Sequence, residues 1–394
     1  MYILNRGGKM DFALTEDQRL IQESVRDFMQ SKEVATWIKK AETDKEFPHE
    51  FMKRAAGLGY LAMTIDPKYG GAGLGPLDAI VAMEEFAYRS VPFSLNILVQ
   101  NSLAGHAIAT FGTEEQKTKY LPKMAAGELF GCFANTEPDA GSDAKSIITH
   151  AKKYADKWVL NGKKRFCTNA SEAGIAVVFG RTAARARGAP GTTAFLVEIG
   201  SELPGFSLDK KEEKVAQYGS TLCEFSLDDV MVAEDAVLGQ VGRGWEVCDK
   251  TFRHSRIWIA MQGVGVARRA IDETIAYGSL RKTFGKPIVE HQHVAFELAK
   301  ARVALESARL LVFKAAWQEA EGDSEFVITA SMAKYAAGEL AEKASCLCYR
   351  YFGGLSISSE SISSKLHRDA AIIPVYEGAS EIQLAIIAKD MLKK

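Results

Sequence analysis

The feature that most constrains this fold is the spacing of apolar residues, which changes twice along the chain. Over residues 15–130 the spacing is helical, as at Ile21, Val25 and Phe28, because residues three and four apart share one helix face. Between about 133 and 239, short β-rich runs bounded by Gly and Pro replace this pattern, and long helical periodicities return from residue 244. The order helical, β, helical predicts an α+β protein.

The same changes predict three domains, which agrees with a length of 394 residues and about 150 residues per domain. We expect an N-terminal α-helical domain over residues 10–130. A middle β domain should follow over residues 131–240, and a C-terminal helical bundle over residues 241–394.

Short motifs predict particular elements within these domains. Thr15 and Gln18 fit a capping box at the start of the first helix. Asn161-Gly162 stands between two β-rich runs and predicts a tight hairpin turn. Further strands are expected at 174–180, 192–199 and 222–232, and long helices at 288–320 and 326–350.

The composition excludes several classes of protein. Lys plus Arg total 49 and Asp plus Glu total 50, so the net charge is −1 and gives no reason to expect a nucleic-acid or anionic-membrane partner. An apolar content of 47% excludes a long disordered chain. No apolar run reaches the ~18 residues needed to span a bilayer.

Cysteine and histidine usage indicates neither disulfides nor a metal. Six cysteines in 394 residues are too sparse for a disulfide scaffold. Cys346 and Cys348 have no second ligand pair, and His291-Gln292-His293 has no carboxylate motif to complete a site, so we expect no metal. The N-terminal segment MYILNRGGKM has too short an apolar stretch for a signal peptide. The expected compartment is therefore the reducing cytoplasm.

Four motifs in a fixed order carry the functional signal. Residues 136–143 (TEPDAGSD) have small and hydroxyl side chains that let backbone N–H groups approach an anionic cofactor, although alone they also fit a polar turn. Residues 164–170 (KRFCTNA), 281–286 (RKTFGK) and 376–383 (YEGASEIQ) follow. Together these motifs resemble the acyl-CoA dehydrogenase flavoproteins over the whole chain from Met10. The resemblance implies a middle β-barrel or sandwich and a C-terminal four-helix bundle.

The resemblance also implies an FAD whose flavin lies between the β domain and the bundle. Thr136 would bond the pyrimidine side of the ring and Thr168 would donate near flavin N5, since such donors stabilise the electron-rich reduced ring. Ser142 would lie near the pyrophosphate and also meet the substrate. The other residues implied to border the flavin are Phe133, Asn135 and Phe166, which stands where many relatives have Trp.

A second group resembles positions that hold the FAD of a neighbouring subunit. It implies at least a dimer and, as is usual in the family, a tetramer built as a dimer of dimers. Arg281 suits a pyrophosphate because its guanidinium offers paired donors in one plane. The other members are Thr283, Phe284, His291 and Gln292, together with the double-glycine turn Gly353 and Gly354, where backbone must approach the cofactor closely.

Glu377 matches the catalytic base of most family members. The implied reaction removes a proton from Cα of an acyl-CoA thioester and a hydride from Cβ, giving a trans-2-enoyl-CoA, with electrons passed to electron-transfer flavoprotein. A carboxylate can take that proton only if desolvation raises its pKa and the enolate is stabilised. In the family the backbone N–H of the base helps to bind the thioester oxygen. Tyr376 and Gly378 flank this base and are expected at the substrate.

Several departures from the family pattern affect the substrate site. Arg253 stands where relatives have an acid that helps to bind the pantetheine arm, while the usual Arg256 is kept. Arg253 could meet a phosphate or a substrate carboxylate, or be a solvated surface residue. Trp258 replaces a residue that is often Gly, and either reshapes the acyl pocket or fills core. Leu95 and Val99 suggest an apolar acyl cavity.

Other departures concern the cofactor and leave alternatives open. Arg350 replaces a common Gln, Ala379 a common Thr, and Glu381 is Gln in some members, which affects the inter-subunit FAD contacts. An oxidase that uses dioxygen, an enzyme acting on an acyl-carrier-protein thioester, and a non-catalytic FAD-bound scaffold remain alternatives. The length and type of the acyl group, the electron acceptor and the exact oligomer are not determined by the sequence.

Overall fold

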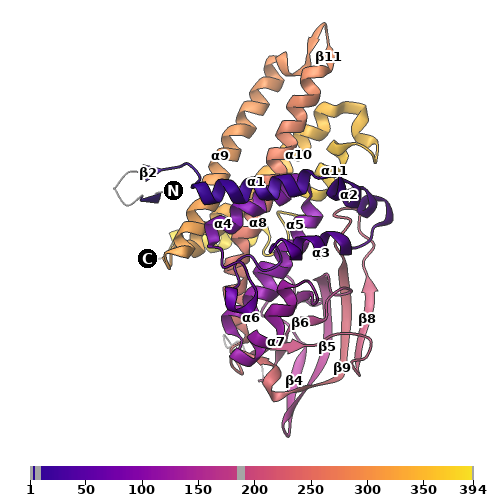
Figure 1. Ribbon diagram of the computed structural model, residues 1–394, viewed down its shortest axis with the longest axis vertical. Helices are drawn as coiled ribbons and strands as arrows, with labels where there is room; N and C mark the ends of the chain where they lie inside the picture. The colour runs from indigo at the N-terminus through magenta and orange to yellow at the C-terminus, as the bar shows by residue number, and fades with distance from the viewer. Residues whose placement is uncertain (1–2, 5–9, 184–190, 393–394) are drawn as a thin grey trace.

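The protein is elongated, with a β-sheet at one end, a helical bundle at the other and a layer of helices across the middle (Figure 1). The structure is a computed structural model that describes residues 3–4, 10–183 and 191–392. In this part of the chain no helix combines the length and apolar character needed to cross a membrane.

The N-terminal part is helical after a short ribbon of β1 (Ile3–Leu4) and β2 (Met10–Asp11). The Thr15 hydroxyl accepts the backbone N–H of Gln18 and the Gln18 amide oxygen accepts that of Thr15, both at 3.2 Å, which confirms the predicted capping box. The elements are α1 (Glu16–Gln30), α2 (Lys32–Asp44), α3 (His49–Gly57), η1 (Pro67–Tyr69), α4 (Pro76–Arg89), α5 (Val91–Leu98), the π-helix η2 (Val99–Gly105), α6 (His106–Phe111) and α7 (Glu114–Ala125).

The middle part is one eight-stranded sheet, which confirms the predicted β domain type. Its order is β10-β7-β6-β4-β5-β9-β8, with β3 paired in parallel to β6. Inward apolar side chains such as Phe195 and Phe225, both fully buried, fill its interior. The strands are β3 (Gly131–Ala134), β4 (His150–Tyr154), β5 (Lys157–Thr168), β6 (Ile175–Arg181), β7 (Thr192–Val197), β8 (Phe206–Lys211), β9 (Leu222–Ala233) and β10 (Val237–Leu238).

The hairpin predicted at Asn161-Gly162 is wrong, because β5 runs through these residues without turning. The turn lies earlier, at Ala155-Asp156 between β4 and β5. The Asn161 side chain bonds the backbone N–H and the carboxylate of Asp229 on β9, both at 2.9 Å. At Gly162 a Cβ would stand 2.3 Å from the Thr149 hydroxyl oxygen. The Asn-Gly pair therefore makes a bulge, where strand pairing overrides the local turn preference.

The C-terminal part is a bundle of long helices whose core continues into the N-terminal helices. Trp258 and Ala337 of the bundle share one buried cluster with Val25 and Phe86. The elements are α8 (Gly244–Leu280), β11 (Lys282–Thr283), β12 (Lys286–Pro287), η4 (Ile288–Glu290), α9 (Gln292–Ala320), α10 (Phe326–Phe352), η5 (Gly353–Ile357), α11 (Ile362–Ala370) and α12 (Ser380–Met391), while η3 (Glu234–Ala236) joins β9 to β10 in the middle part. The predicted fold class, with helical ends and a central β domain, is confirmed.

Candidate active site

Glu377 lies in the loop between α11 and α12, in a backbone conformation that residues other than glycine rarely adopt. Its φ is 53° and that of Gly378 is 96°, so two successive residues are left-handed. A non-glycine residue in this region costs about 1 kcal/mol or more and persists only where surrounding contacts fix it. Among the residues that the structure describes, no group accepts the backbone N–H of Glu377.

Lys334 of α10 is the main support of this loop. Its side chain is buried, and Nζ donates to the carbonyl oxygens of Pro374 and Gly378, each at 2.8 Å. The amide of Gln383 on α12 donates to the same Gly378 oxygen, also at 2.8 Å. The left-handed turn is therefore held from two helices.

Tyr376 anchors the other side of Glu377 to the N-terminal helices. Its hydroxyl donates to Oε1 of Gln262 on α8, and the Gln262 amide donates to Ser94 Oγ at 2.8 Å and to Val91 O at 3.1 Å. Gln262 and Ser94 are fully buried. Burial raises the pKa of the Tyr376 hydroxyl, so it stays a neutral donor. Helices α5 and α8 and the loop thus form one unit around the carboxylate.

Burial dominates the charge state of Glu377 and raises its pKa to about 7. The hydrogen bond from Ser255 and the charges of Lys334 and Arg256 oppose this shift. Burial in turn lowers the pKa of Lys334 to about 8. A carboxylate with a pKa near neutral pH is matched to general-base work, since it is both ionised and basic enough to take a proton.

The substrate-side residues of α8 fall into two environments. Arg256 is buried with its Nε lacking a hydrogen-bond partner, and burial lowers its pKa. Arg253 is partly exposed and pairs with Asp249 at 2.6 Å, so the acid lost from position 253 has a counterpart one helical turn earlier. Both guanidinium groups retain donors for a further partner.

The three apolar positions expected at the acyl chain are all buried. Trp258 is 1% exposed, Leu95 7% and Val99 2%, and they belong to the cluster shared by α5, η2 and α8. The Trp258 side chain therefore fills part of the core beside the site and is not exposed to solvent. This placement agrees with an apolar wall beside the site.

The residues expected at the flavin come from β3, β5 and the turn after β3. Phe133 packs edge-on against Phe252 of α8, with ring centroids 5.3 Å apart, which joins the sheet to the bundle. Phe166 has a φ of 55° and is 51% exposed, so β5 turns a large aromatic ring outward at a bulge. Thr168 ends β5. Its neighbour Asn169 bonds Asn96 of α5 at 3.0 Å.

A buried ion pair shapes the TEPDAGSD segment. Lys164 is fully buried, and its Nζ donates to the Glu137 carboxylate at 2.7 Å and to Asn135 O at 3.2 Å. Glu137 also accepts the backbone N–H groups of Ile148 and Thr149. These charge-assisted bonds fix both ends of the loop that carries Thr136 and Ser142, and they lower the pKa of Glu137.

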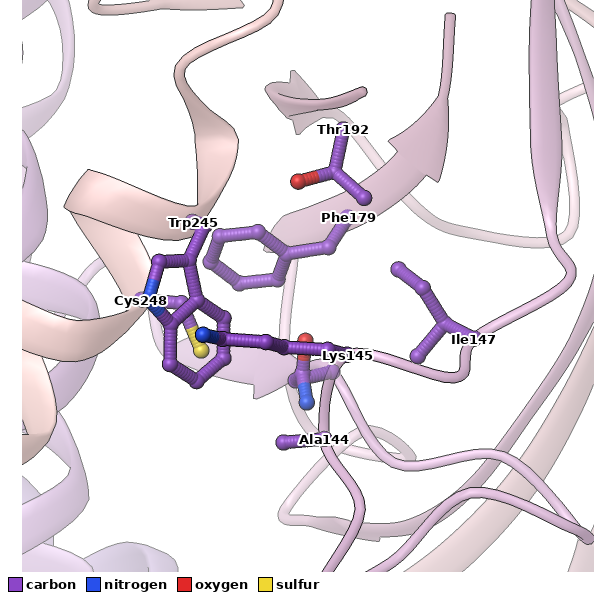
Figure 2. A pocket seen from close by; sticks show the side chains of 8 residues that line it. Ala144, Lys145, Ile147, Phe179, Thr192, Trp245 and Cys248 are labelled. Atoms are coloured by element: carbon purple, nitrogen blue, oxygen red, sulfur yellow. The ribbon is translucent and has the colours of Figure 1, made fainter. Parts of the chain in front are cut away.

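A small pocket opens beside this loop, at the junction of the β domain and the start of α8. Figure 2 shows the aliphatic chain of Lys145 extended across the Trp245 ring, with Phe179 beside them. The Lys145 ammonium lies 4.7 Å from the ring centroid, within cation–π range. Asn135, expected beside the flavin, also lines this pocket.

Most of the group expected to meet a neighbouring subunit's FAD lies at the end of the molecule opposite the sheet, around the β11–β12 hairpin (Figure 1). Phe284 is 98% exposed there and Leu280 83%. Thr283 Oγ1 and His291 Nε2 are 3.0 Å apart, so His291 bonds within the hairpin. Arg281 ends α8 and Gln292 begins α9, whereas Arg350, Gly353 and Gly354 lie where α10 ends. Ala379 caps α12, and Glu381 lies exposed in its first turn.

The predicted site residues thus form two separate groups within one chain. The residues near Glu377 and on the β domain lie where the sheet meets the bundle, and Ala379 and Glu381 follow Glu377 directly, at the start of α12. The β11–β12 hairpin is remote from them, because Ser255, which bonds Glu377, and Leu280, beside the hairpin, are separated by about 37 Å along α8 at ~1.5 Å per residue. The first group has the side chains that a flat aromatic cofactor needs, because the exposed Phe166 ring can stack and the partly exposed Thr136 and Thr168 can donate hydrogen bonds. A cluster of three or more metal-ligating side chains is absent from the described residues.

The chain matches the family models described as acyl-CoA dehydrogenase N-terminal domain at residues 15–128, middle domain at 132–230 and C-terminal domain at 242–392. The chain belongs to the acyl-CoA dehydrogenase family. The family is FAD-dependent, and its members are oxidoreductases acting on CH–CH groups.

Individual relatives match over nearly the whole chain. The mitochondrial short-chain specific acyl-CoA dehydrogenase of Homo sapiens is 38% identical over 96% of this chain and 91% of that protein. The CarC subunit of the caffeyl-CoA reductase-Etf complex of Acetobacterium woodii is 35% identical over 96% and 99%. The structure of butyryl-CoA dehydrogenase from Megasphaera elsdenii has a TM-score of 0.92 and 34% identity, and covers 98% of this chain and 100% of that one.

Sequence reasoning missed the residues that hold the site together. Lys334, Gln262 and Ser255 read as ordinary helix positions, although each bonds the loop of Glu377 or its neighbours. Lys164 and Glu137 lay inside recognised motifs without an assigned role. The available signal was the presence of Lys and Gln within otherwise apolar helix faces, because such side chains are buried only when paired.

Proposed function

We propose that this protein is an FAD-dependent acyl-CoA dehydrogenase that converts a short acyl-CoA thioester into the trans-2-enoyl-CoA. The observation that carries the proposal is the placement of the Glu377 carboxylate, which Ser255 bonds in a left-handed loop whose Glu377 N–H has no acceptor among the described residues. Burial raises the pKa of this carboxylate to about 7. This carboxylate sits in a loop fixed by Lys334 and Tyr376, at the junction of the bundle and the β domain.

In this proposal Glu377 takes the proton from Cα of the thioester. Desolvation makes the carboxylate basic enough for this step. Its own backbone N–H has no acceptor among the described residues, so it is free to donate to the thioester oxygen and stabilise the enolate. Bound FAD supplies the acceptor for the Cβ hydride. The residues of this chain position the Glu377 carboxylate at Cα, the Glu377 N–H at the thioester oxygen, and Cβ toward the flavin.

The cofactor would be held by both groups of residues. Thr136, Thr168 and Phe166 border the flavin in this scheme, and the Lys164–Glu137 pair keeps their loop in place. Ser142 meets pyrophosphate and substrate. The hairpin group around Arg281 and Phe284 would reach the FAD of a second copy, because its apolar side chains are exposed in a single chain.

A short acyl group is the substrate class that the relatives and the apolar core beside the site favour. The human and Megasphaera relatives carry names specifying short-chain and butyryl-CoA substrates. The core beside Glu377 is apolar and closely packed at Leu95, Val99 and Trp258. Close packing there leaves less room for a long acyl chain. Electron-transfer flavoprotein is the proposed acceptor, since a relative is named as a subunit of an Etf complex.

The test is anaerobic bleaching of the FAD-loaded protein by a panel of saturated acyl-CoA thioesters of increasing length. We expect rapid bleaching by C4 to C6 chains and slower bleaching beyond them. A flavin that no thioester bleaches would contradict the proposal. Bleaching by an acyl-carrier-protein thioester alone would identify a different carrier.

The electron acceptor needs a separate measurement. Substrate-reduced protein is mixed either with oxidised electron-transfer flavoprotein or with air. Fast reoxidation by the flavoprotein and slow reoxidation in air support a dehydrogenase. Fast reoxidation in air with release of peroxide would instead identify an oxidase on the same fold.

A further inference from the structure

Ser255 makes the one direct side-chain hydrogen bond to the Glu377 carboxylate within the described residues. It lies fully buried on α8, and its Oγ donates to Glu377 Oε2. The same Oγ lies 3.4 Å from the carbonyl oxygen of Phe252, one turn earlier on the helix. A single hydroxyl therefore has two acceptors within reach, one of which is the base.

This pair of acceptors suits both protonation states of the base. While Glu377 is ionised, the Ser255 hydroxyl donates to it. After Glu377 has taken a proton it becomes a donor, and the Ser255 oxygen can accept a hydrogen bond from the carboxyl O–H while the hydroxyl hydrogen of Ser255 turns to Phe252 O. The switch needs only rotation of a hydroxyl. It leaves no polar group unpaired in either state, which matters because an unpaired buried group is costly.

We propose that Ser255 is the positioning residue of the base: its hydroxyl holds the Glu377 carboxylate in place before proton abstraction and accepts a hydrogen bond from it afterwards. The inference rests on the proposed function of Glu377. It assigns a task to a side chain that lies outside the recognised motifs and on a different helix from the loop.

Other charged and titratable groups also face the carboxylate and must be kept constant in a test. Lys334 faces it from α10, Arg256 and His254 from α8, and Tyr376 from the loop itself. His254 is in turn bonded to Glu319 at 2.8 Å, and its ring stacks on His106 with centroids 3.9 Å apart. None of these side chains donates a hydrogen bond to Glu377 among the described residues.

The experiment is an infrared titration of the FAD-loaded protein without substrate. The stretching band of a protonated carboxyl is followed against pH, and the band of Glu377 is assigned by its loss in Glu377→Gln. We expect Ser255→Ala to raise the midpoint of this band by about one pH unit, as expected for one charge-assisted hydrogen bond. Ser255→Thr keeps the hydroxyl and should restore the wild-type midpoint.

Thr251→Val is the matched control. Thr251 is fully buried on the same helix, one turn before Ser255, and its hydroxyl has no partner. Its loss should leave the midpoint unchanged. A Ser255→Ala midpoint equal to that of the wild type would overturn the inference. If Ser255→Ala does not fold, Ser255→Cys keeps the size of the side chain and replaces the hydroxyl by a much weaker S–H donor, which gives the same test.

The pH profile of kcat/KM gives a second readout. Its acid limb should move upward in Ser255→Ala by the same amount as the infrared midpoint, with kcat lowered more than KM is changed. A wild-type protein that no thioester bleaches would refute the proposed function without altering the infrared result. An active wild type whose acid limb is the same in Ser255→Ala would refute the role of Ser255 alone.

Discussion

The loop of Glu377 and the β11–β12 hairpin are both expected to serve the cofactor site, yet the chain treats them in opposite ways. The loop is held within the chain, because Lys334 and Gln383 donate to its carbonyl oxygens and the Tyr376 hydroxyl donates to α8. The hairpin leaves Phe284 98% exposed and Leu280 83% exposed. One element is completed by its own fold, while the other presents apolar surface to solvent.

This difference indicates which part of the site one chain can build alone. A base needs a fixed position and a defined pKa, and both come from burial inside the subunit. Exposed large apolar side chains at the tip of a hairpin indicate a missing partner instead. A second copy of this chain is the expected partner. The following predictions test the contrast, from the largest expected effect to the smallest.

Glu377→Gln should slow flavin bleaching by about a thousandfold, because a positioned general base contributes roughly 10²- to 10⁴-fold. The amide keeps the shape of the side chain but cannot take the proton. FAD content, measured from the protein's absorbance, should stay at the wild-type value. Wild-type bleaching in this variant would remove Glu377 from the mechanism.

Lys334→Met should lower the free energy of unfolding by about 2 kcal/mol, because the buried Pro374 carbonyl loses its donor and the Gly378 carbonyl keeps only that of Gln383. Bleaching should also slow, since the left-handed turn at Glu377 loses its support. Urea unfolding and bleaching rates measure the two effects. Lys343→Met removes an exposed lysine of the same helix and should change neither. If both variants have the same unfolding free energy and bleaching rate, Lys334 does not stabilise the loop.

The stability of the protein should report the burial of Glu377. Its pKa rises from 4.5 to about 7 on folding, so the folded state binds a proton more tightly than the unfolded state. Stability therefore falls as pH rises from about 4.5 to 7. Glu377→Gln should raise the unfolding free energy at pH 8 by about 2 kcal/mol, allowing for partial exposure, and by much less at pH 5. A pH-independent difference between variant and wild type would contradict the shift.

Phe284→Ser should weaken self-association about tenfold, as expected for burying one large apolar side chain in an interface. The unfolding free energy of a single subunit should change by less than about 0.5 kcal/mol, because the ring makes few contacts in its own chain. Sedimentation at several concentrations measures the first effect. If Phe284→Ser assembles as the wild type does, the interface lies elsewhere. If self-association weakens, FAD retention should fall with it.

Much of the architecture could be predicted from the sequence where local pattern and tertiary contacts agree. The capping box at Thr15 and the strand over 222–232 lie where they were expected. The predicted hairpin at Asn161-Gly162 failed because Asp229, distant in sequence, supplies the partner that extends β5. The second long helix of the bundle begins at Gln292, since a short turn (η4) takes up residues 288–290.

The sequence by itself determined the family, the order of domains and Glu377 as the candidate base, because these depend on residue type and spacing. Only the tertiary structure decided that Glu377 has a raised pKa, that Lys334 and Ser255 bond its loop and carboxylate, and that the β11–β12 hairpin lies far from it along α8. The reason is physical. Burial and hydrogen-bond partners come from residues remote along the chain, such as Ser255 and Glu377, which are 122 positions apart and meet only when α8 packs beside the final loop.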